Sequence, residues 1–357
     1  MKKAEIHSDR IELLDSFRAI SILSVMLFHL FNRWAQGNYL PYGSKYAYFS
    51  KGYLGVDLFF IISGFVIYYT LTKTDSIINF WKKRFIRLFP PLLIASILTY
   101  IVFILWDNEM LIPNSHSLKN LLISITFIPP RFFKLVGIDV EYINGSYWSL
   151  WPEVLFYVYA SIFYFFFKKR FRLFMSLLST IGYIGITILG QTDFSKTEVS
   201  SIFIIVKLIE YLPLFVFGIY FYTLYNKEAL KIYELGLLVI QLLLISPFNT
   251  SGLFNSFTDF YFILGMIVLF SVFVYNSKIL NFLKAPFLIK IGKYSYFLYL
   301  IHENIGVLMI HKYANVFEPF LFISPLLVIL FFIEFSAFYS KYVDEKITTY
   351  LKRVLLK

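Results

Sequence analysis

The chain alternates between long apolar runs and short polar segments. The runs are about 18 to 25 residues long and lack the alternation of apolar and polar positions typical of strands, so they predict helices that cross a bilayer. Ten spans are expected: Leu13–Asn32, Tyr53–Thr72, Leu88–Trp106, Trp148–Phe167, Phe171–Gly190, Ser201–Tyr225, Leu230–Pro247, Thr258–Tyr275, Tyr294–His311 and Pro319–Tyr342. The predicted fold class is therefore all-α, a polytopic membrane bundle of about ten transmembrane helices.

The segments between these spans carry an uneven distribution of positive charge. Most of the 33 Lys and Arg residues fall in segments that are cytoplasmic if the N-terminus is inside, and cytoplasmic loops are enriched in these residues. We therefore expect both termini to be cytoplasmic. Insertion orientation and anionic lipid headgroups then explain the net charge of +11, and no nucleic-acid partner is needed.

Composition narrows the class of protein and its chemistry. A hydrophobic share of 59% and a mean hydropathy of +0.69 exceed what a soluble domain carries. Because there is no cysteine, disulfides, metal–thiolate sites and a cysteine nucleophile are excluded, and no metal site is predicted. No Walker-type loop is present, which argues against ATP-driven work, and Gly52 with Gly55 is predicted to serve close helix packing.

Three polar residues interrupt the first span: Asp15, Arg18 and His29. The eleven residues from Arg18 to His29 turn a helix by about 1100°, close to three full turns, so both side chains share one face, and Asp15 lies on the same face. An Asp15–Arg18 pair at the membrane boundary with an unrelated histidine is the alternative. Intramembrane charge is costly and usually functional, so the functional interpretation is favoured.

The segment from Asp107 to Tyr147 matches no full span and is predicted to lie outside as a cap or re-entrant segment. Its apolar part, Leu118–Ile128, is too short to cross and ends at Pro129 and Pro130. Such a segment could cover a cavity that opens to the outside.

The fourth span opens with Trp148, Ser149 and Glu153, and Tyr157 follows one turn later. A carboxylate in the first turn of a helix has a structural explanation, because it meets the positive end of the helix dipole. The functional alternative is that Glu153 faces His29, since both are expected near the external ends of their spans. A carboxylate beside an imidazole is the arrangement that a general base needs.

Two further motifs lie at opposite ends of the chain. Arg84 and Arg87 stand three residues apart in a basic cluster before the third span, where they either set orientation or clamp phosphates. Ser295, Tyr299 and His302 share one face of the ninth span, as a hydrogen-bonded histidine in the core or as part of a site. Three other charges are left without a role: Lys207 and Glu210, which can form a buried ion pair, and Glu334.

Taken together, these motifs resemble the acyltransferase 3 family, the bacterial integral-membrane acyltransferases that modify carbohydrates. The resemblance spans nearly the whole chain. It depends on the Arg18-to-His29 spacing after Leu14–Phe17, the segment Gly52–Phe65, Arg84 with Arg87, Trp148–Leu150 with Glu153 and Tyr157, and Tyr294–Leu300 with His302. The family's arginine pattern near the sixth span is not seen in Tyr211–Gly218.

The resemblance implies a multi-pass enzyme of the bacterial inner (plasma) membrane that transfers an acyl group from acyl-CoA, expected to be acetyl-CoA, to a hydroxyl of a surface or secreted carbohydrate. The acceptor can be a free or lipid-linked exopolysaccharide, lipopolysaccharide or other glycan, and no cofactor is permanently bound. His29 is expected to be the catalytic base, oriented by Glu153, either in direct transfer or through an acyl-histidine. Arg18, Arg84 and Arg87 would hold CoA, and Asp15 and Ser63 would have orienting roles. Substrate binding is assigned to Trp148, Ser149, Tyr157, Tyr299 and His302.

The chain is expected to form one membrane domain over residues 1–345, followed by a basic cytoplasmic tail over 346–357, with no appended soluble domain. The alternative function is a transporter or flippase for a lipid-linked sugar, which would also need many helices and intramembrane charges. A glycan polymerase is a third, weaker alternative. Neither of these functions would consume acyl-CoA.

Overall fold

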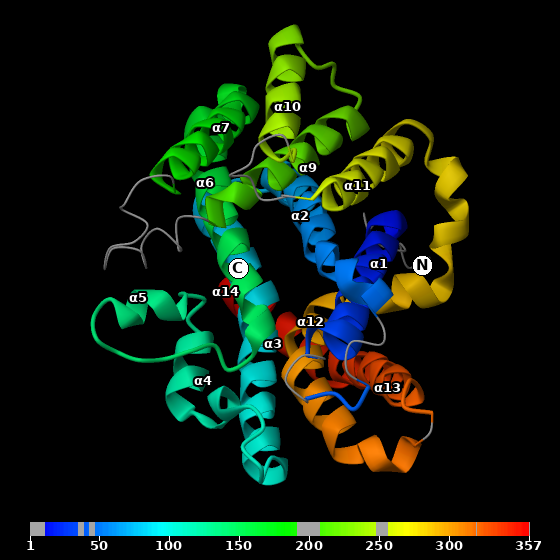
Figure 1. Ribbon diagram of the computed structural model, residues 1–357. Coiled ribbons are helices and arrows are strands. Elements are labelled where there is room, and N and C mark those ends of the chain that lie inside the picture. Colours follow the sequence, from blue (N-terminus) through cyan, green and yellow to red (C-terminus); the bar gives the residue numbers. More distant parts are fainter. Residues whose placement is uncertain are drawn as a thin grey trace, which may run out of the picture.

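The computed structural model describes residues 11–34, 39–42, 47–190, 208–247, 256–318 and 320–356. Within these ranges every regular element is helical (Figure 1). The helices are α1 (Glu12–Phe28), α2 (Gly55–Thr72), α3 (Ile77–Trp106), α4 (Leu118–Ser124), α5 (Pro130–Lys134), α6 (Leu150–Phe167), α7 (Phe171–Gly190), α9 (Leu212–Tyr225), α10 (Ile232–Leu244), α11 (Phe257–Asn276), α12 (Pro286–Tyr313), α13 (Ile323–Tyr339) and α14 (Glu345–Leu355). The all-α prediction is confirmed for this part of the chain.

Six segments of the described chain are long and apolar enough to cross a membrane, and one of them, Gly145–Leu189, contains both α6 and α7. Residues 201–207 of the predicted span 201–225 lie outside the described residues, and the described remainder contains α9, of 14 residues. The predicted span 230–247 contains α10, of 13 residues. At about 1.5 Å per residue, a helix of this length is shorter than the hydrocarbon core. Helix α12 has 28 residues, but it carries charged side chains and is not among the six. The structure thus supports a membrane protein without reproducing the count of ten.

Helix α3 begins at Ile77, eleven residues before the predicted start at Leu88, and this boundary prediction was wrong. The side chain of Ser76 caps the helix by accepting a hydrogen bond from the backbone N–H of Asn79. The pair Pro90 and Pro91 lies inside the helix instead of near its start. As a result, the basic cluster is part of a helix, which fixes the direction of its arginine side chains.

Helix α1 lies at the centre, packed against α2 and α12, and α2 in turn packs against α9 (Figure 1). Glycines make these contacts close. A Cβ on Gly292 would stand 1.8 Å from the carbonyl oxygen of Asp15, and one on Gly64 would stand 2.0 Å from that of Phe215. A Cβ on Gly52 or Gly55 would likewise stand 2.2 or 2.4 Å from a carbonyl oxygen of α1, which confirms the predicted packing role of these two glycines.

The segment between α3 and α6 contains the short helices α4 and α5 and two 3-10 turns, Pro113–His116 and Gly145–Ser149, and α4 lies beside α3 (Figure 1). The prediction that it forms no full span is confirmed. Polar side chains attach it to α12: Asn144 donates to the carbonyl of Leu300, and Asn304 donates to Ser115 and to the carbonyl of Ile143. These bonds place the segment next to His302.

The outer faces of the bundle expose large apolar side chains, such as Val239 of α10, Val268 of α11 and Leu330 of α13. Exposed apolar surface of this extent is typical of helices that face lipid. The predicted basic tail is largely helical, as α14, and it packs against α3.

Candidate active site

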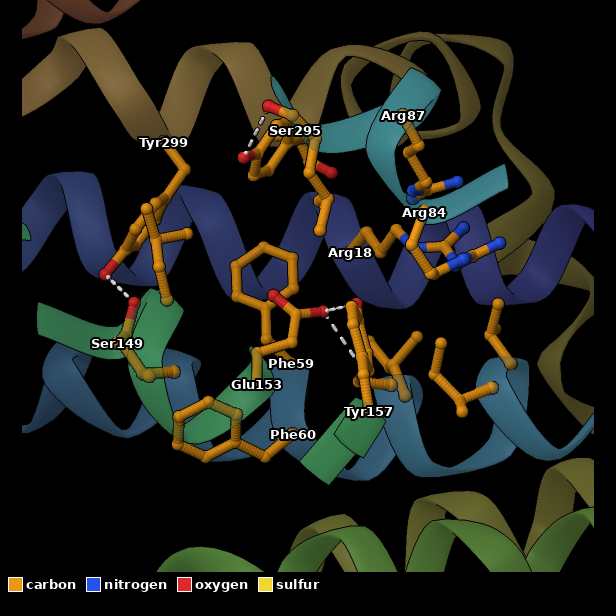
Figure 2. Close-up of a pocket in the computed structure, with 18 residues that line it drawn as sticks. Arg18, Phe59, Phe60, Arg84, Arg87, Ser149, Glu153, Tyr157, Ser295 and Tyr299 are labelled. Atoms are coloured by element: carbon orange, nitrogen blue, oxygen red, sulfur yellow. Dashed lines mark hydrogen bonds between the residues drawn. The ribbon is translucent and has the colours of Figure 1, made fainter. Parts of the chain in front are cut away.

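A narrow pocket lies inside the bundle between α1, α2, α3, α6 and α12, with a cavity volume of about 90 Å³. Figure 2 shows Arg18, Arg84 and Arg87 at one end of it and Ser149 with Tyr299 at the other, with Glu153 and Tyr157 between them. The remaining walls are mostly apolar, formed by side chains such as Phe59 and Phe60. The pocket thus joins a cationic end to a hydroxyl-lined end.

A wider cavity of about 830 Å³ adjoins the cationic end, because Arg18, Arg84 and Arg87 line both spaces. We call it the basic vestibule. Six basic side chains line it, against the two acidic ones of Asp344 and Glu345: Arg18, Lys83, Arg84, Arg87, Lys293 and Lys352. Its volume falls in the range of about 300–1,000 Å³ that ligand sites occupy. The vestibule is therefore suited in size and charge to a polyanionic ligand.

The three predicted phosphate-binding arginines come together in the structure. Arg84 is buried, 8% exposed, and its Nε has no hydrogen-bond partner in the described part of the chain. Its guanidinium carbon lies 5.8 Å from the ring centre of Phe80 and 6.0 Å from that of Tyr157. Arg18 forms an ion pair with Asp15, whose Oδ1 lies 2.8 Å from Nη1. A buried guanidinium with an open donor is costly unless a ligand satisfies it.

Glu153 occupies the middle of the pocket, and its partners differ from the predicted one. Its Oε1 accepts a hydrogen bond of 3.0 Å from the Ser63 hydroxyl and a short one from Tyr157. The expected pairing of Glu153 with His29 is therefore corrected. Glu153 stands on the first turns of α6, whose side chains at this position face α2 and the arginines. Ser63 and Tyr157 are thus the hydrogen-bond partners of this carboxylate.

The far end of the pocket is closed by a hydrogen bond of 2.8 Å between the hydroxyls of Ser149 and Tyr299. The Tyr299 hydroxyl also donates to the carbonyl of Ser146. Trp148, predicted to bind substrate, packs against Tyr211 with ring centres 5.5 Å apart and is not part of the pocket wall. Beyond Tyr299 lies the ring of His302, 5.5 Å away between centres.

His29 begins a turn of π-helix, His29–Arg33, at the end of α1. Such turns are rare and occur frequently at functional sites. Its Nδ1 shares a hydrogen bond of 2.8 Å with Nε2 of His302, and its Nε2 lies 3.6 Å from Oε1 of Glu303. His302 Nδ1 in turn lies 2.7 Å from the carbonyl oxygen of Tyr299. Two predicted residues, His29 and His302, therefore meet directly.

Glu303 is the site residue that the sequence analysis missed. It is 3% exposed and accepts a hydrogen bond of 3.1 Å from Trp34 Nε1. A Cβ on Gly145 would stand 3.2 Å from both of its oxygens, so a glycine backbone packs against the carboxylate. Its place directly after His302, in the same intramembrane motif, was the available signal.

Two of the three unexplained charges can now be placed. Glu334 forms an ion pair with Lys290, with Oε1 and Nζ 2.9 Å apart, on an exposed face. Glu210 is buried at the edge of α9. Lys207, its predicted partner, lies outside the described residues.

An apolar helical bundle thus encloses a cationic vestibule, a narrow pocket and a histidine pair. The family model described as an acyltransferase domain matches residues 11–339, and the chain therefore belongs to the acyltransferase 3 family. The chain is 27% identical over 191 residues to the O-acetyltransferase OatA of Staphylococcus aureus strains NCTC 8325 / PS 47, COL and MRSA252. That match covers 50% of this chain and 28% of OatA. No solved structure matches the chain.

Proposed function

We propose that this protein transfers an acetyl group from acetyl-CoA to a hydroxyl of a surface or secreted carbohydrate. Membership of the acyltransferase 3 family supports the transfer of an acyl group, and the name of OatA supports acetyl as the group and oxygen as the acceptor atom. One observation carries the proposal. The basic vestibule, the central pocket, Tyr299, His302 and His29 follow one another from one side of the bundle toward the other.

The donor enters from the vestibule, which faces the cytoplasm in the predicted orientation. Charge-assisted hydrogen bonds from Arg84 and Arg87 hold the phosphates of CoA, and the open Nε of Arg84 gains a partner. The narrow pocket accepts the extended thioester arm once the hydrogen bond between Ser149 and Tyr299 at its far end opens. Arg18 and His29 are about 16 Å apart along the helix axis, at about 1.5 Å per residue, so an extended arm can cover this distance.

The acceptor hydroxyl approaches from the opposite side, where His29 lies near Trp34. His29 removes the hydroxyl proton, and the oxygen attacks the thioester carbonyl carbon. The new C–O bond forms, the C–S bond breaks, and the CoA thiolate receives the proton from His29. The products are the O-acetylated sugar and free CoA, so atoms and charge balance.

The absence of cysteine makes a direct assay simple. Protein purified into lipid nanodiscs is mixed with acetyl-CoA and with envelope glycan from cells that lack the gene, and free thiol is followed with a thiol-reactive dye. Since the chain has no thiol of its own, all signal reports CoA. We expect thiol release that depends on both the protein and the glycan, with acetyl on the recovered glycan. Glycan that moves across proteoliposomes without any need for acetyl-CoA would favour the transporter alternative and contradict the proposal.

A further inference from the structure

Resting on the proposed function, we propose that His302 and Glu303 are positioning residues of a hydrogen-bond relay that keeps His29 in one tautomer. In this tautomer Nε2 of His29 is unprotonated and can accept the proton of the acceptor hydroxyl. The relay consists of the Tyr299 carbonyl, His302, His29 and Glu303. It replaces the predicted pairing of His29 with Glu153, and it assigns to His302 a role other than substrate binding.

The Tyr299 carbonyl, the first member of the relay, determines which ring nitrogen of each histidine carries the hydrogen. The Tyr299 carbonyl oxygen can only accept, so the His302 nitrogen 2.7 Å from it, Nδ1, carries the hydrogen. In the neutral ring of His302 the other nitrogen, Nε2, is then an acceptor. It lies 2.8 Å from His29 Nδ1, which must therefore donate. A neutral His29 with its hydrogen on Nδ1 has a lone pair on Nε2.

The bare Nε2 of His29 faces the carboxylate of Glu303, at 3.6 Å from Oε1. This distance is longer than a hydrogen bond, as expected before the nitrogen carries a proton. The His29 and Glu303 side chains are 11% and 4% exposed, so their charges are little screened by water. When the acceptor hydroxyl gives its proton to Nε2, the imidazolium meets a carboxylate that is already held by Trp34.

The arrangement is comparable in logic to a Ser-His-Asp triad, in which the group behind the histidine fixes its tautomer. Here the neutral ring of His302 lies behind His29, at Nδ1, and the carboxylate of Glu303 lies near Nε2, the nitrogen that receives the proton. The proton travels from the acceptor oxygen to Nε2 and from Nε2 to the CoA sulfur, while the Nδ1 hydrogen of His29 stays in place. No step requires His302 to give up the hydrogen on its Nδ1.

The first test compares two replacements of His302 in the thiol-release assay. A glutamine can donate its amide to the Tyr299 carbonyl and accept from His29 with its oxygen, whereas a leucine of similar volume can do neither. We expect His302→Gln to retain kcat within about tenfold, and His302→Leu to lose a factor of about 10² or more, with the KM for acetyl-CoA unchanged in both. His311→Leu, on the same helix but bonded to Tyr39 and Glu109, is the matched control and should stay near the parent. Equal losses in the glutamine and leucine variants would overturn the relay.

The second test does not depend on activity. Nitrogen-15 chemical shifts of labelled histidine, assigned by comparison with His29→Gln and His302→Gln, report which ring nitrogen carries the hydrogen. Both rings are expected as neutral Nδ1–H tautomers. A His29 ring with its hydrogen on Nε2 would overturn the relay even if acetyl transfer is observed. Conversely, the expected tautomers in a protein that transfers no acetyl group would leave the geometry of the relay intact and contradict the proposed function.

Glu303 is tested separately, since it acts on the proton-receiving side. Glu303→Gln keeps an oxygen for Trp34 but removes the negative charge. We expect kcat to fall by about 10²-fold without a change in the KM for acetyl-CoA, because the imidazolium loses its counter-ion. A loss expressed in the KM alone would contradict this role.

Discussion

Gly292 of α12 lies directly against the backbone carbonyl of Asp15 in α1, since a Cβ at that glycine would stand 1.8 Å from the oxygen. Helix α12 carries His302, and His29 directly follows α1, so this contact belongs to the framework of the site. Close approach of helix backbones at small residues is a common basis of membrane-helix packing.

Gly292→Ala is therefore expected to destabilise the protein. An alanine inside a helix is ordinarily more favourable than glycine by about 1 kcal/mol, but here the methyl group must push the helices apart, at a cost of about 1–3 kcal/mol. The apparent melting temperature in detergent, at a fixed heating rate, checks this. Gly185→Ala in α7 is the control, because nothing lies within 4 Å of its added Cβ. Equal melting temperatures for the two variants would show that α1 and α12 are not in such close contact.

Arg84 and Arg87 are expected to determine donor affinity. Replacing either arginine by glutamine removes a charge-assisted hydrogen bond to a phosphate of CoA. Such a bond contributes about 1.5–3 kcal/mol to binding, so the KM for acetyl-CoA should rise by about 10- to 100-fold. The kcat should change little. Lys82→Gln removes a positive charge from the same helix but from outside the vestibule wall, and it should leave the KM unchanged. If all three variants raise the KM alike, the effect is general charge attraction and not a clamp.

Glu153→Gln distinguishes the observed partners of this residue from the predicted one. Both hydrogen bonds of the carboxylate end on one oxygen, and an amide oxygen can accept both, so we expect less than about a tenfold loss of kcat/KM. Glu153→Ala leaves two hydroxyls without their acceptor and should cost more. A carboxylate that orients the catalytic histidine would instead give a loss of about 10⁴ on conversion to the amide. Such a loss in Glu153→Gln would support the predicted pairing of Glu153 with His29 and contradict the observed one.

Asp107, in the loop after α3, makes the segment between α3 and α6 sensitive to acid. Burial by itself raises the pKa of Asp107, but hydrogen bonds from the His116 ring and from the N–H groups of Leu111 and Ile112 outweigh it and lower the pKa below its usual value. A carboxyl group with a lowered pKa stabilises the fold above its unfolded pKa of about 4, and this contribution is lost as the pH falls through the folded pKa.

Hydrogen exchange of peptides from residues 107–147, corrected for the intrinsic rate, should therefore show steady protection from pH 7 to 5 and a loss below about pH 4. In Asp107→Asn the segment should be less protected at pH 7, and the acid-dependent step should shrink. An unchanged acid step in that variant would assign the loss to another group.

The sequence was sufficient to predict features that depend on local spacing. The pair Arg84 and Arg87 and the packing glycines follow from helical periodicity, because a residue's direction on a helix is determined by its position in the chain. The segment of residues 107–147 was also recognisable from its length.

Pairings between helices could not be predicted in this way. Glu153 and Glu303 are both carboxylates within predicted spans, and only the packing of α12 against α1 brings Glu303, and not Glu153, to His29. The start of α3 was missed because the predicted span followed the apolar run, whereas Lys and Arg are good helix formers and the helix extends through the basic cluster to its cap at Ser76. The length of the hydrophobic run at 230–247 also did not reveal that α10, with 13 residues, is too short to count as a full span.

The most direct test of the account is the acetyl content of the surface and secreted glycans, measured by mass spectrometry in cells with the intact gene, a deletion, and His29→Ala at matched protein levels. We predict an acetyl mass increment on one glycan only with the intact gene, and its loss in both other strains. Normal acetylation in the His29→Ala strain would contradict the central claim that this histidine performs the transfer. Unchanged acetylation with a glycan that accumulates inside the cell would instead identify a transporter.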